Sequence, residues 1–344
     1  MLKNILYLLT IAICGFTEIH AQNSRGVDFQ KFDDIQKVFD LAKAQNKNVF
    51  VEAFSPTCQH CEAYIPTFSK TEVGNYYNSG FISYKLDLTQ DKSFRFLNKH
   101  HIWIPSTPTM MFFDANENLL HIVPAGDEQN NEQGVILFAR NALDPAQRTS
   151  SYKASYAAGN REVNFLYNYA FVARMTQDTT ENIEAMREYA IKVPESQYSS
   201  PGNFLILQKI VMDDENPMFR YMISHLIEFS TKNDPKQVKQ AAENIIMFSL
   251  YSSRGRKFTE EKRKEMKANL AKLGIDAKSI AGRFVVSDVN YALDQKDEEK
   301  AFRYINDFYE NKPIPVKEAD FWCSLLKSRI TSPKTDKICK AAGK

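Results

Sequence analysis

The chain has 344 residues, enough for two domains of ordinary size. Its 44 Lys and Arg residues nearly balance its 42 Asp and Glu residues, which leaves a net charge of only +2. Because binding to a phosphate backbone needs a concentrated positive charge, this balance argues against a nucleic-acid-binding protein.

The first 21 residues have the layout of a secretory signal peptide. Lys3 gives a positive start, residues 5–16 are mostly apolar, and Ala21 precedes the expected cleavage point. The apolar run is shorter than the roughly 20 residues that span a bilayer, which argues against an uncleaved anchor. Cys14 raises the alternative of a lipoprotein, but Ile13 before it is larger than the small residue usual at such sites. We therefore expect a periplasmic or secreted protein.

A C-x-x-C motif follows the first predicted strand. Apolar spacing predicts a helix over residues 29–46, and the run Asn48–Phe54 predicts a buried strand. A second helix over residues 59–77 would place Cys58 where the strand ends and the helix begins. Backbone N–H groups at a helix start favour a thiolate. We interpret Cys58 as the attacking cysteine and Cys61 as the resolving one.

Glu52 is an acidic residue in the middle of the apolar strand. Burial there is expected to raise its pKa. It precedes Cys58 by six residues, so the alternation of a strand places it on the inward side, beneath the helix start. There its carboxyl group would take the proton from Cys61 when that thiol attacks. The alternative is a carboxylate on an edge strand in solvent.

The remaining elements of this half alternate between strands and helices. Proline cannot donate to a strand ladder, so Pro108 is expected at the start of a strand, with the Thr107–Pro108 bond either cis or in the ordinary trans form. The pattern predicts strands over residues 81–88, 109–113 and 119–123, and helices over 91–100 and 131–143. Together these elements predict a mixed sheet with helices on both faces.

This array of residues resembles the thioredoxin superfamily over roughly residues 28–145. The matching features, in chain order, are Glu52, the pair Cys58 and Cys61, Pro66, Thr107-Pro108-Thr109 and Gly126. The resemblance implies a thioredoxin fold in which Pro108 is cis and lies against the C-x-x-C motif. It also implies that the backbone of Thr107 binds the substrate chain. No metal, nucleotide or organic cofactor is required for the implied reaction.

The C-x-x-C motif differs from that of thioredoxin itself in the two residues between the cysteines and in the residue before the first cysteine. The inner residues are Gln59 and His60, and Thr57 replaces the usual tryptophan. In the oxidising and isomerising branches of the family a histidine before the second cysteine is common. Its imidazole can stabilise the Cys58 thiolate, which would make the disulfide a stronger oxidant. Residues 61–81 and 107–114, in contrast, resemble the reducing thioredoxin domains of bacterial envelope proteins. The direction of electron flow therefore stays open.

The pattern changes at Asp144-Pro145, which predicts a thioredoxin-like domain over residues 22–145 and an all-α domain over 146–344. Residues 162–193 and 284–310 each predict two helices joined by a short polar turn, loosely resembling a tetratricopeptide repeat. Several aromatic residues are interpreted as packing between helices, with a binding groove as the alternative: Phe165, Tyr167, Tyr169, Phe219, Tyr221, Phe248 and Tyr251.

Two further cysteines, Cys323 and Cys339, lie near the C-terminus. The mature chain would hold four cysteines, and an even number in an oxidising compartment allows two pairs. We therefore expect a structural disulfide between them. The alternative is two free thiols, one buried beside Trp322.

The sequence favours an exported thiol–disulfide oxidoreductase that exchanges disulfides with protein substrates, with a membrane electron donor or acceptor as a further candidate partner. A competing interpretation is a helical adaptor or chaperone in which the thioredoxin domain is only a scaffold. A third is a copper-handling protein that uses His60, His100 or His101. A zinc site at Cys58, His60 and Cys61 is disfavoured because no fourth ligand is close in the sequence.

Overall fold

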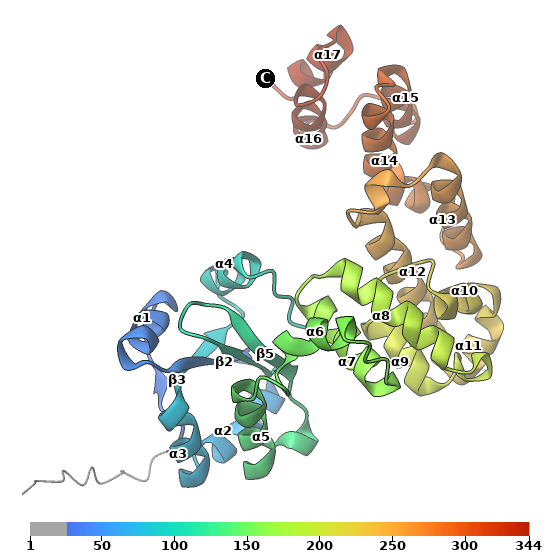
Figure 1. The fold of residues 1–344 in the computed structure, drawn as a ribbon. Helices are drawn as coiled ribbons and strands as arrows, with labels where there is room; N and C mark the ends of the chain where they lie inside the picture. Colours follow the sequence, from blue (N-terminus) through green and yellow to red (C-terminus); the bar gives the residue numbers. More distant parts are fainter. Residues whose placement is uncertain (1–25, 344) are drawn as a thin grey trace, which may run out of the picture.

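The computed structural model describes residues 26–343, so the predicted signal peptide and Cys14 lie outside the described residues. Two parts follow one another along the chain: a sheet surrounded by helices, and an array of helices (Figure 1). None of the helices within residues 26–343 is both long and apolar enough to cross a bilayer.

Five strands form one mixed sheet in the order β1-β3-β2-β4-β5. They are β1 (Phe29–Gln30), β2 (Asn48–Phe54), β3 (Phe81–Asp87), β4 (Thr109–Phe113) and β5 (Leu119–Pro124). The first three strands run parallel to one another, and β4 and β5 are antiparallel to their neighbours. The strand β2 lies in the centre of the sheet between β3 and β4, which accounts for its continuous run of buried residues.

Helices cover both faces of the sheet, as the sequence predicts. On one face lie α1 (Gln36–Gln45) and α4 (Asp91–Lys99); on the other lie α2 (Gln59–Phe68), α3 (Thr71–Gly80) and α5 (Glu132–Leu143). Along β2, Val49, Val51 and Ala53 pack toward the first face, whereas Phe50 packs toward the second. Since strand residues alternate, Glu52 also points to the face that carries α2.

Two predicted helices are shorter than expected. The helix expected over residues 29–46 begins only at Gln36, because Phe29 and Gln30 pair with Ser83 and Tyr84 of β3. The helix expected over 59–77 is broken in two after Phe68. At the break Lys70 is extended, with ψ of 139°, and the Phe68 carbonyl accepts a hydrogen bond from the Val27 N–H. Both differences arise from long-range strand and loop contacts, which the helical spacing of apolar residues does not report.

The second part is all-α, in agreement with the prediction. Its helices are α6 (Tyr152–Ala157), α7 (Val163–Met175), α8 (Thr179–Lys192), α9 (Pro201–Lys209), α10 (Pro217–Ser224), α11 (Leu226–Lys232), α12 (Pro235–Tyr251), α13 (Glu260–Lys272), α14 (Ala277–Asp294), α15 (Glu298–Phe308), α16 (Val316–Lys327) and α17 (Pro333–Ala341). The pairs α7–α8 and α14–α15 form helical hairpins. In each, an aspartate caps the second helix: Asp178 accepts from the Glu181 N–H, and Asp297 from the Lys300 N–H.

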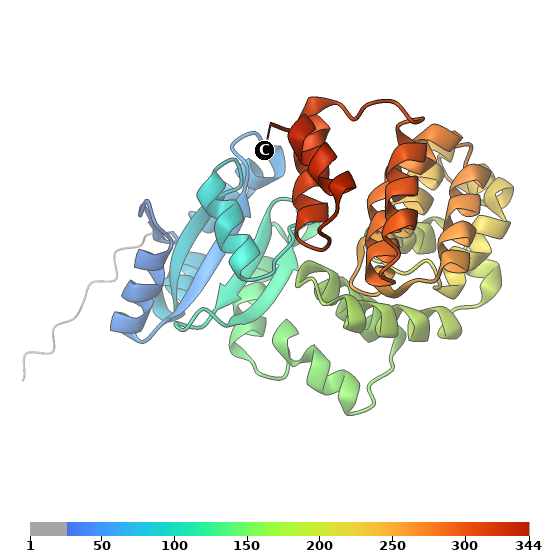
Figure 2. The same ribbon diagram turned by 90° about the horizontal axis from the view of Figure 1, so that it is seen from above.

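The two parts share packing and hydrogen bonds. Phe171, Val172 and Met175 of α7 pack against the core on the α1 and α4 face of the sheet. At the end of the sheet, the Thr149 N–H donates to Nδ1 of His121 on β5, and the Thr149 hydroxyl accepts from the Ile122 N–H. Figure 2 shows the sheet and the helical array side by side, and Figure 1 shows α6 and α7 next to β5, where the two parts meet.

Candidate active site

The C-x-x-C motif lies at the junction of β2 and α2. Cys58 is the N-cap residue of α2, with extended backbone (ψ 104°), and its Sγ accepts a hydrogen bond of 3.1 Å from the Cys61 N–H. The two cysteines form a disulfide. Cys58 is half-buried, whereas Cys61 is only 4% exposed. An incoming sulfur therefore reaches Cys58 first, and Cys61 lies behind it.

This position favours a thiolate on Cys58 once the disulfide is reduced. The first N–H groups of a helix lack partners within the helix and carry partial positive charge. The Cys61 N–H already points at the Cys58 sulfur. A negative charge on that sulfur would be stabilised by this hydrogen bond and by the helix start.

The loop before β4 brings a peptide group against the same sulfur. The Thr107–Pro108 bond is cis, and the Thr107 carbonyl oxygen lies 3.5 Å from Cys58 Sγ. The loop is fixed on both sides of this bond, because the Thr109 hydroxyl donates to the Ser106 carbonyl and the Ala125 N–H donates to the Pro108 carbonyl. The structure thus brings Thr107 and Pro108 to the motif, 49 residues away along the chain.

The helical part holds the beginning of this loop. The Trp103 N–H donates to the carbonyl of Met175 at 2.7 Å. The guanidinium of Arg174 lies 4.9 Å from the Trp103 ring and 4.7 Å from the Phe248 ring. Burial lowers the pKa of Arg174 to about 10. The two aromatic faces compensate part of the lost hydration of this cation, and they join the loop to α7 and α12.

Glu52 is completely buried, on the face of the sheet that carries α2. Burial raises the pKa of its carboxyl group, and the Lys85 ammonium, 2.9 Å from Oε2, opposes this increase. The other oxygen, Oε1, has no hydrogen-bond partner among the described residues. A carboxyl group with a raised pKa and an unused oxygen is suited to accept and return a proton.

The imidazole of His60 is held by an acidic side chain from a distant segment of the chain. His60 Nδ1 lies 2.8 Å from Oδ1 of Asp127, and both side chains are exposed. Asp127 begins a 3-10 turn, Asp127–Gln129, that follows β5 and Gly126. The two residues are 67 positions apart, so no local pattern in the sequence points to their contact.

One histidine of the copper interpretation, His100, is bound to a glutamate. His100 Nε2 lies 3.0 Å from Glu117 Oε2, and its ring contacts Phe96 and Phe113. Within residues 26–343, no group of three or more His, Cys, Asp or Glu side chains is placed to hold a metal ion.

Cys323 and Cys339 form a second disulfide, between α16 and α17. Both residues are buried, with exposed fractions of 1% and 2%. Trp322 beside Cys323 belongs to the apolar cluster of α14, α15 and α16. This disulfide therefore ties the last two helices together inside a packed region.

No family model matches the chain. A protein of Schizosaccharomyces pombe described as a putative protein disulfide-isomerase is 26% identical over 109 residues, which is 32% of this chain and 21% of that protein. The chain therefore spans about a fifth of the length of that relative. A solved disulphide isomerase from Xylella fastidiosa Temecula1 covers 33% of this chain and 95% of its own, at 13% identity and a TM-score of 0.28.

The sheet order, the cysteine pair at the start of α2 and the cis proline beside it are the features of a thioredoxin fold. The N-terminal part of the chain has this fold.

Proposed function

We propose that this protein is an exported thiol–disulfide oxidoreductase that exchanges the Cys58–Cys61 disulfide with cysteines of protein substrates. One observation carries the proposal. A half-buried sulfur at a helix start lies against the Thr107 peptide group, with a buried second cysteine behind it. The apolar leader of the sequence supports the exported location.

Exchange proceeds through a mixed disulfide. When the protein acts as a reductant, the Cys58 thiolate attacks a substrate disulfide, a Cys58–substrate bond forms, and the other substrate sulfur leaves as a thiolate. Cys61 then loses its proton and attacks Cys58, which releases the second substrate sulfur and restores the Cys58–Cys61 bond. The reverse sequence oxidises a substrate dithiol.

Other residues of the site assist these two steps. Glu52 accepts the proton from Cys61, and its raised pKa allows it to return the proton in the reverse direction. The Thr107 backbone aligns the substrate chain beside Cys58, and Pro108 shapes that loop. A positive charge on His60 would add to the stabilisation of the thiolate, and Asp127 sets the position of its ring. The helical part supports the loop through Trp103 and Arg174.

The proposal is tested by insulin reduction in the presence of dithiothreitol. Cys58→Ser is expected to lower the rate to that of dithiothreitol alone, because the remaining thiol, Cys61, is buried and does not reach the substrate. Cys61→Ser is expected to accumulate a mixed disulfide on Cys58 that mass spectrometry detects. Full turnover by Cys58→Ser would reject the proposed reaction.

A further inference from the structure

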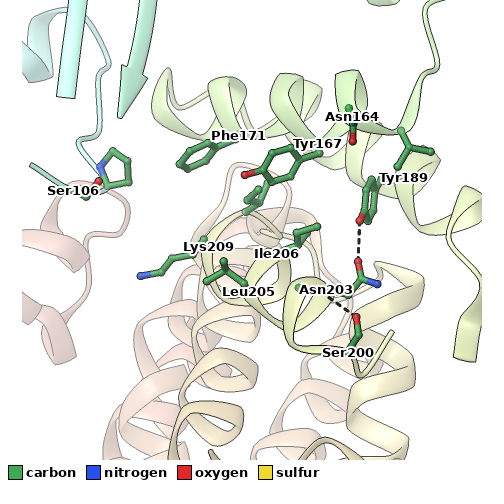
Figure 3. A pocket seen from close by; sticks show the side chains of 14 residues that line it. Ser106, Asn164, Tyr167, Phe171, Tyr189, Ser200, Asn203, Leu205, Ile206 and Lys209 are labelled. Carbon is green, nitrogen blue, oxygen red and sulfur yellow. Dashed lines mark hydrogen bonds between the residues drawn. The ribbon is translucent and has the colours of Figure 1, made fainter. Parts of the chain in front are cut away.

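A cavity of about 570 Å³ lies directly beside the loop that leads to Pro108. Pro105 and Ser106 form one wall, and α7 and α9 form the others (Figure 3). We propose that this cavity binds an apolar or aromatic side chain, and an acidic one next to it, from the extended segment that flanks the reacting cysteine of a protein substrate. The inference rests on the proposed exchange reaction and names the side chains that the site selects.

The cavity is continuous with the place where the substrate backbone is expected. Ser106 lines the cavity, and the next residue, Thr107, has its carbonyl oxygen 3.5 Å from Cys58 Sγ. An extended chain advances about 3.3 Å per residue. A substrate chain aligned along Thr107 therefore reaches the cavity within a few residues of its reacting cysteine. A small disulfide without flanking residues does not extend that far.

The lining is apolar on two helices. Val163, Tyr167 and Phe171 are spaced four residues apart, so they form one line along α7. On α9, Leu205 is 53% exposed and lies next to Ile206 at the same cavity. Figure 3 shows the Tyr167, Leu205 and Ile206 side chains around a common space. An apolar side chain that fills this space would remove their surfaces from water, which is favourable.

The polar groups of the lining fall into two sets. Tyr189, Asn203 and Ser200 are bonded to one another: the Tyr189 hydroxyl donates to Asn203 Oδ1, and the Asn203 N–H donates to Ser200 Oγ. The side chains of Asn164, Tyr167 and Lys209 make no hydrogen bond or ion pair with any described residue. Lys209 is the only charged residue of the lining. Its free ammonium group favours an acidic side chain on the bound segment.

The test uses the reduced full-length protein and three ten-residue peptides. Each carries one cysteine as a mixed disulfide with thionitrobenzoate. The residues that flank the cysteine are Phe and Asp in the first peptide, Phe and Lys in the second, and Ala in the third. Attack by Cys58 on the peptide sulfur forms the Cys58–peptide disulfide and releases coloured thionitrobenzoate. Dithiobis(nitrobenzoate), which has no flanking residues, measures the reactivity of the thiol itself.

We expect the Phe-Asp peptide to react about tenfold faster than the Ala peptide, since covering an aromatic side chain supplies on the order of 1.4 kcal/mol. Leu205→Gln is expected to reduce this ratio to less than about threefold. Ile227→Gln is the matched control, because Ile227 is 86% exposed on α11 and lines none of the described cavities near the site. Lys209→Glu is expected to make the Phe-Lys peptide faster than the Phe-Asp peptide.

The outcomes separate the two proposals. No reaction with dithiobis(nitrobenzoate) or with any peptide would reject the exchange reaction itself. Reaction with all substrates, but at equal rates for the three peptides, would overturn the assignment of the cavity. A preference for Phe-Asp that persists in Leu205→Gln and Lys209→Glu would overturn it as well, because the selecting surface would then lie elsewhere.

Discussion

The two disulfides of the described chain lie in opposite surroundings. Cys58 and Cys61 are three residues apart at the start of a helix, with the first sulfur half-buried next to the Thr107 carbonyl. Cys323 and Cys339 are 16 residues apart, join two helices, and are almost completely buried. Disulfide exchange requires a thiolate to reach a sulfur atom. The Cys58–Cys61 disulfide is therefore suited to exchange, and the Cys323–Cys339 disulfide to stabilising the fold.

The largest expected effect comes from removing the buried disulfide. The double variant Cys323→Ala, Cys339→Ala should lower the free energy of unfolding of the C-terminal helices by about 3 kcal/mol, because a cross-link over such a loop restricts the unfolded chain. Insulin reduction should stay at the wild-type rate. Urea unfolding followed by circular dichroism measures the first quantity. Loss of insulin reduction in this variant would show that Cys323–Cys339 is also needed for exchange, and the two disulfides would not have separate roles.

Acid is expected to weaken the contact between β5 and the helical part, where His121 Nδ1 accepts a hydrogen bond from the Thr149 N–H. Burial lowers the pKa of His121 to about 4. In the unfolded chain the pKa of His121 is near 6.5, so the unfolded state binds the proton more readily. The free energy of unfolding therefore decreases as the pH falls from about 6.5 to about 4. The loss should reach about 3 kcal/mol at pH 4, since protonated Nδ1 can no longer accept from the Thr149 N–H.

Unfolding of the wild type and of His121→Asn at pH 7 and pH 4 isolates this effect. Asparagine keeps a hydrogen-bond acceptor but does not titrate, so the variant should lose less stability on acidification. Equal losses in both proteins would show that His121 does not control the contact between β5 and the helical part.

Replacing Glu52 should slow the second chemical step. In Glu52→Gln, attack of Cys61 on a Cys58–peptide disulfide should be roughly 100-fold slower, at the low end of what a positioned proton acceptor contributes. Single-turnover quench followed by mass spectrometry measures the decay of the mixed disulfide. Glu62→Gln is the control, because Glu62 is an exposed acid in the first turn of α2, next to Cys61 in the sequence. A similar rate in both variants would remove Glu52 from the mechanism.

The smallest expected effect concerns His60. Asp127→Asn removes a negative charge near the site and its contact with the imidazole. Loss of this contact is expected to weaken the stabilisation of the Cys58 thiolate by the imidazole. Since an exposed ion pair contributes about 0.2–1 kcal/mol, the reduction potential of Cys58–Cys61 should fall by at most about 20 mV. Glu128→Gln removes a neighbouring charge that has no contact with His60, and it should shift the potential less. The assignment of Asp127 would be contradicted by equal shifts.

Local patterns predicted the framework of the reactive disulfide. The apolar run of β2, the switch from strand to helix at Cys58 and the proline before β4 each depend on neighbours in the sequence. These patterns also predicted the sheet with helices on both faces and the all-α second part.

Contacts between distant segments could not be predicted in the same way. The His60–Asp127 pair, the His121–Thr149 hydrogen bond and the strand β1 each depend on a partner far away in the sequence. Tyr167 was interpreted as packing between helices, and the structure shows it lining a cavity next to the Pro108 loop. The Pro108 loop and α9 determine which side of α7 stays exposed. The periodicity of apolar residues within α7 carries no information about these two segments.

The most direct test of the different roles of the two disulfides is a redox titration of the whole protein, with alkylation and mass spectrometry reporting each cysteine pair. We expect Cys58–Cys61 to be reduced between about −120 and −270 mV, as in thioredoxin-like exchange sites, whereas Cys323–Cys339 should stay oxidised to below about −300 mV. Reduction of both pairs at one potential, or of the buried pair first, would contradict this expectation.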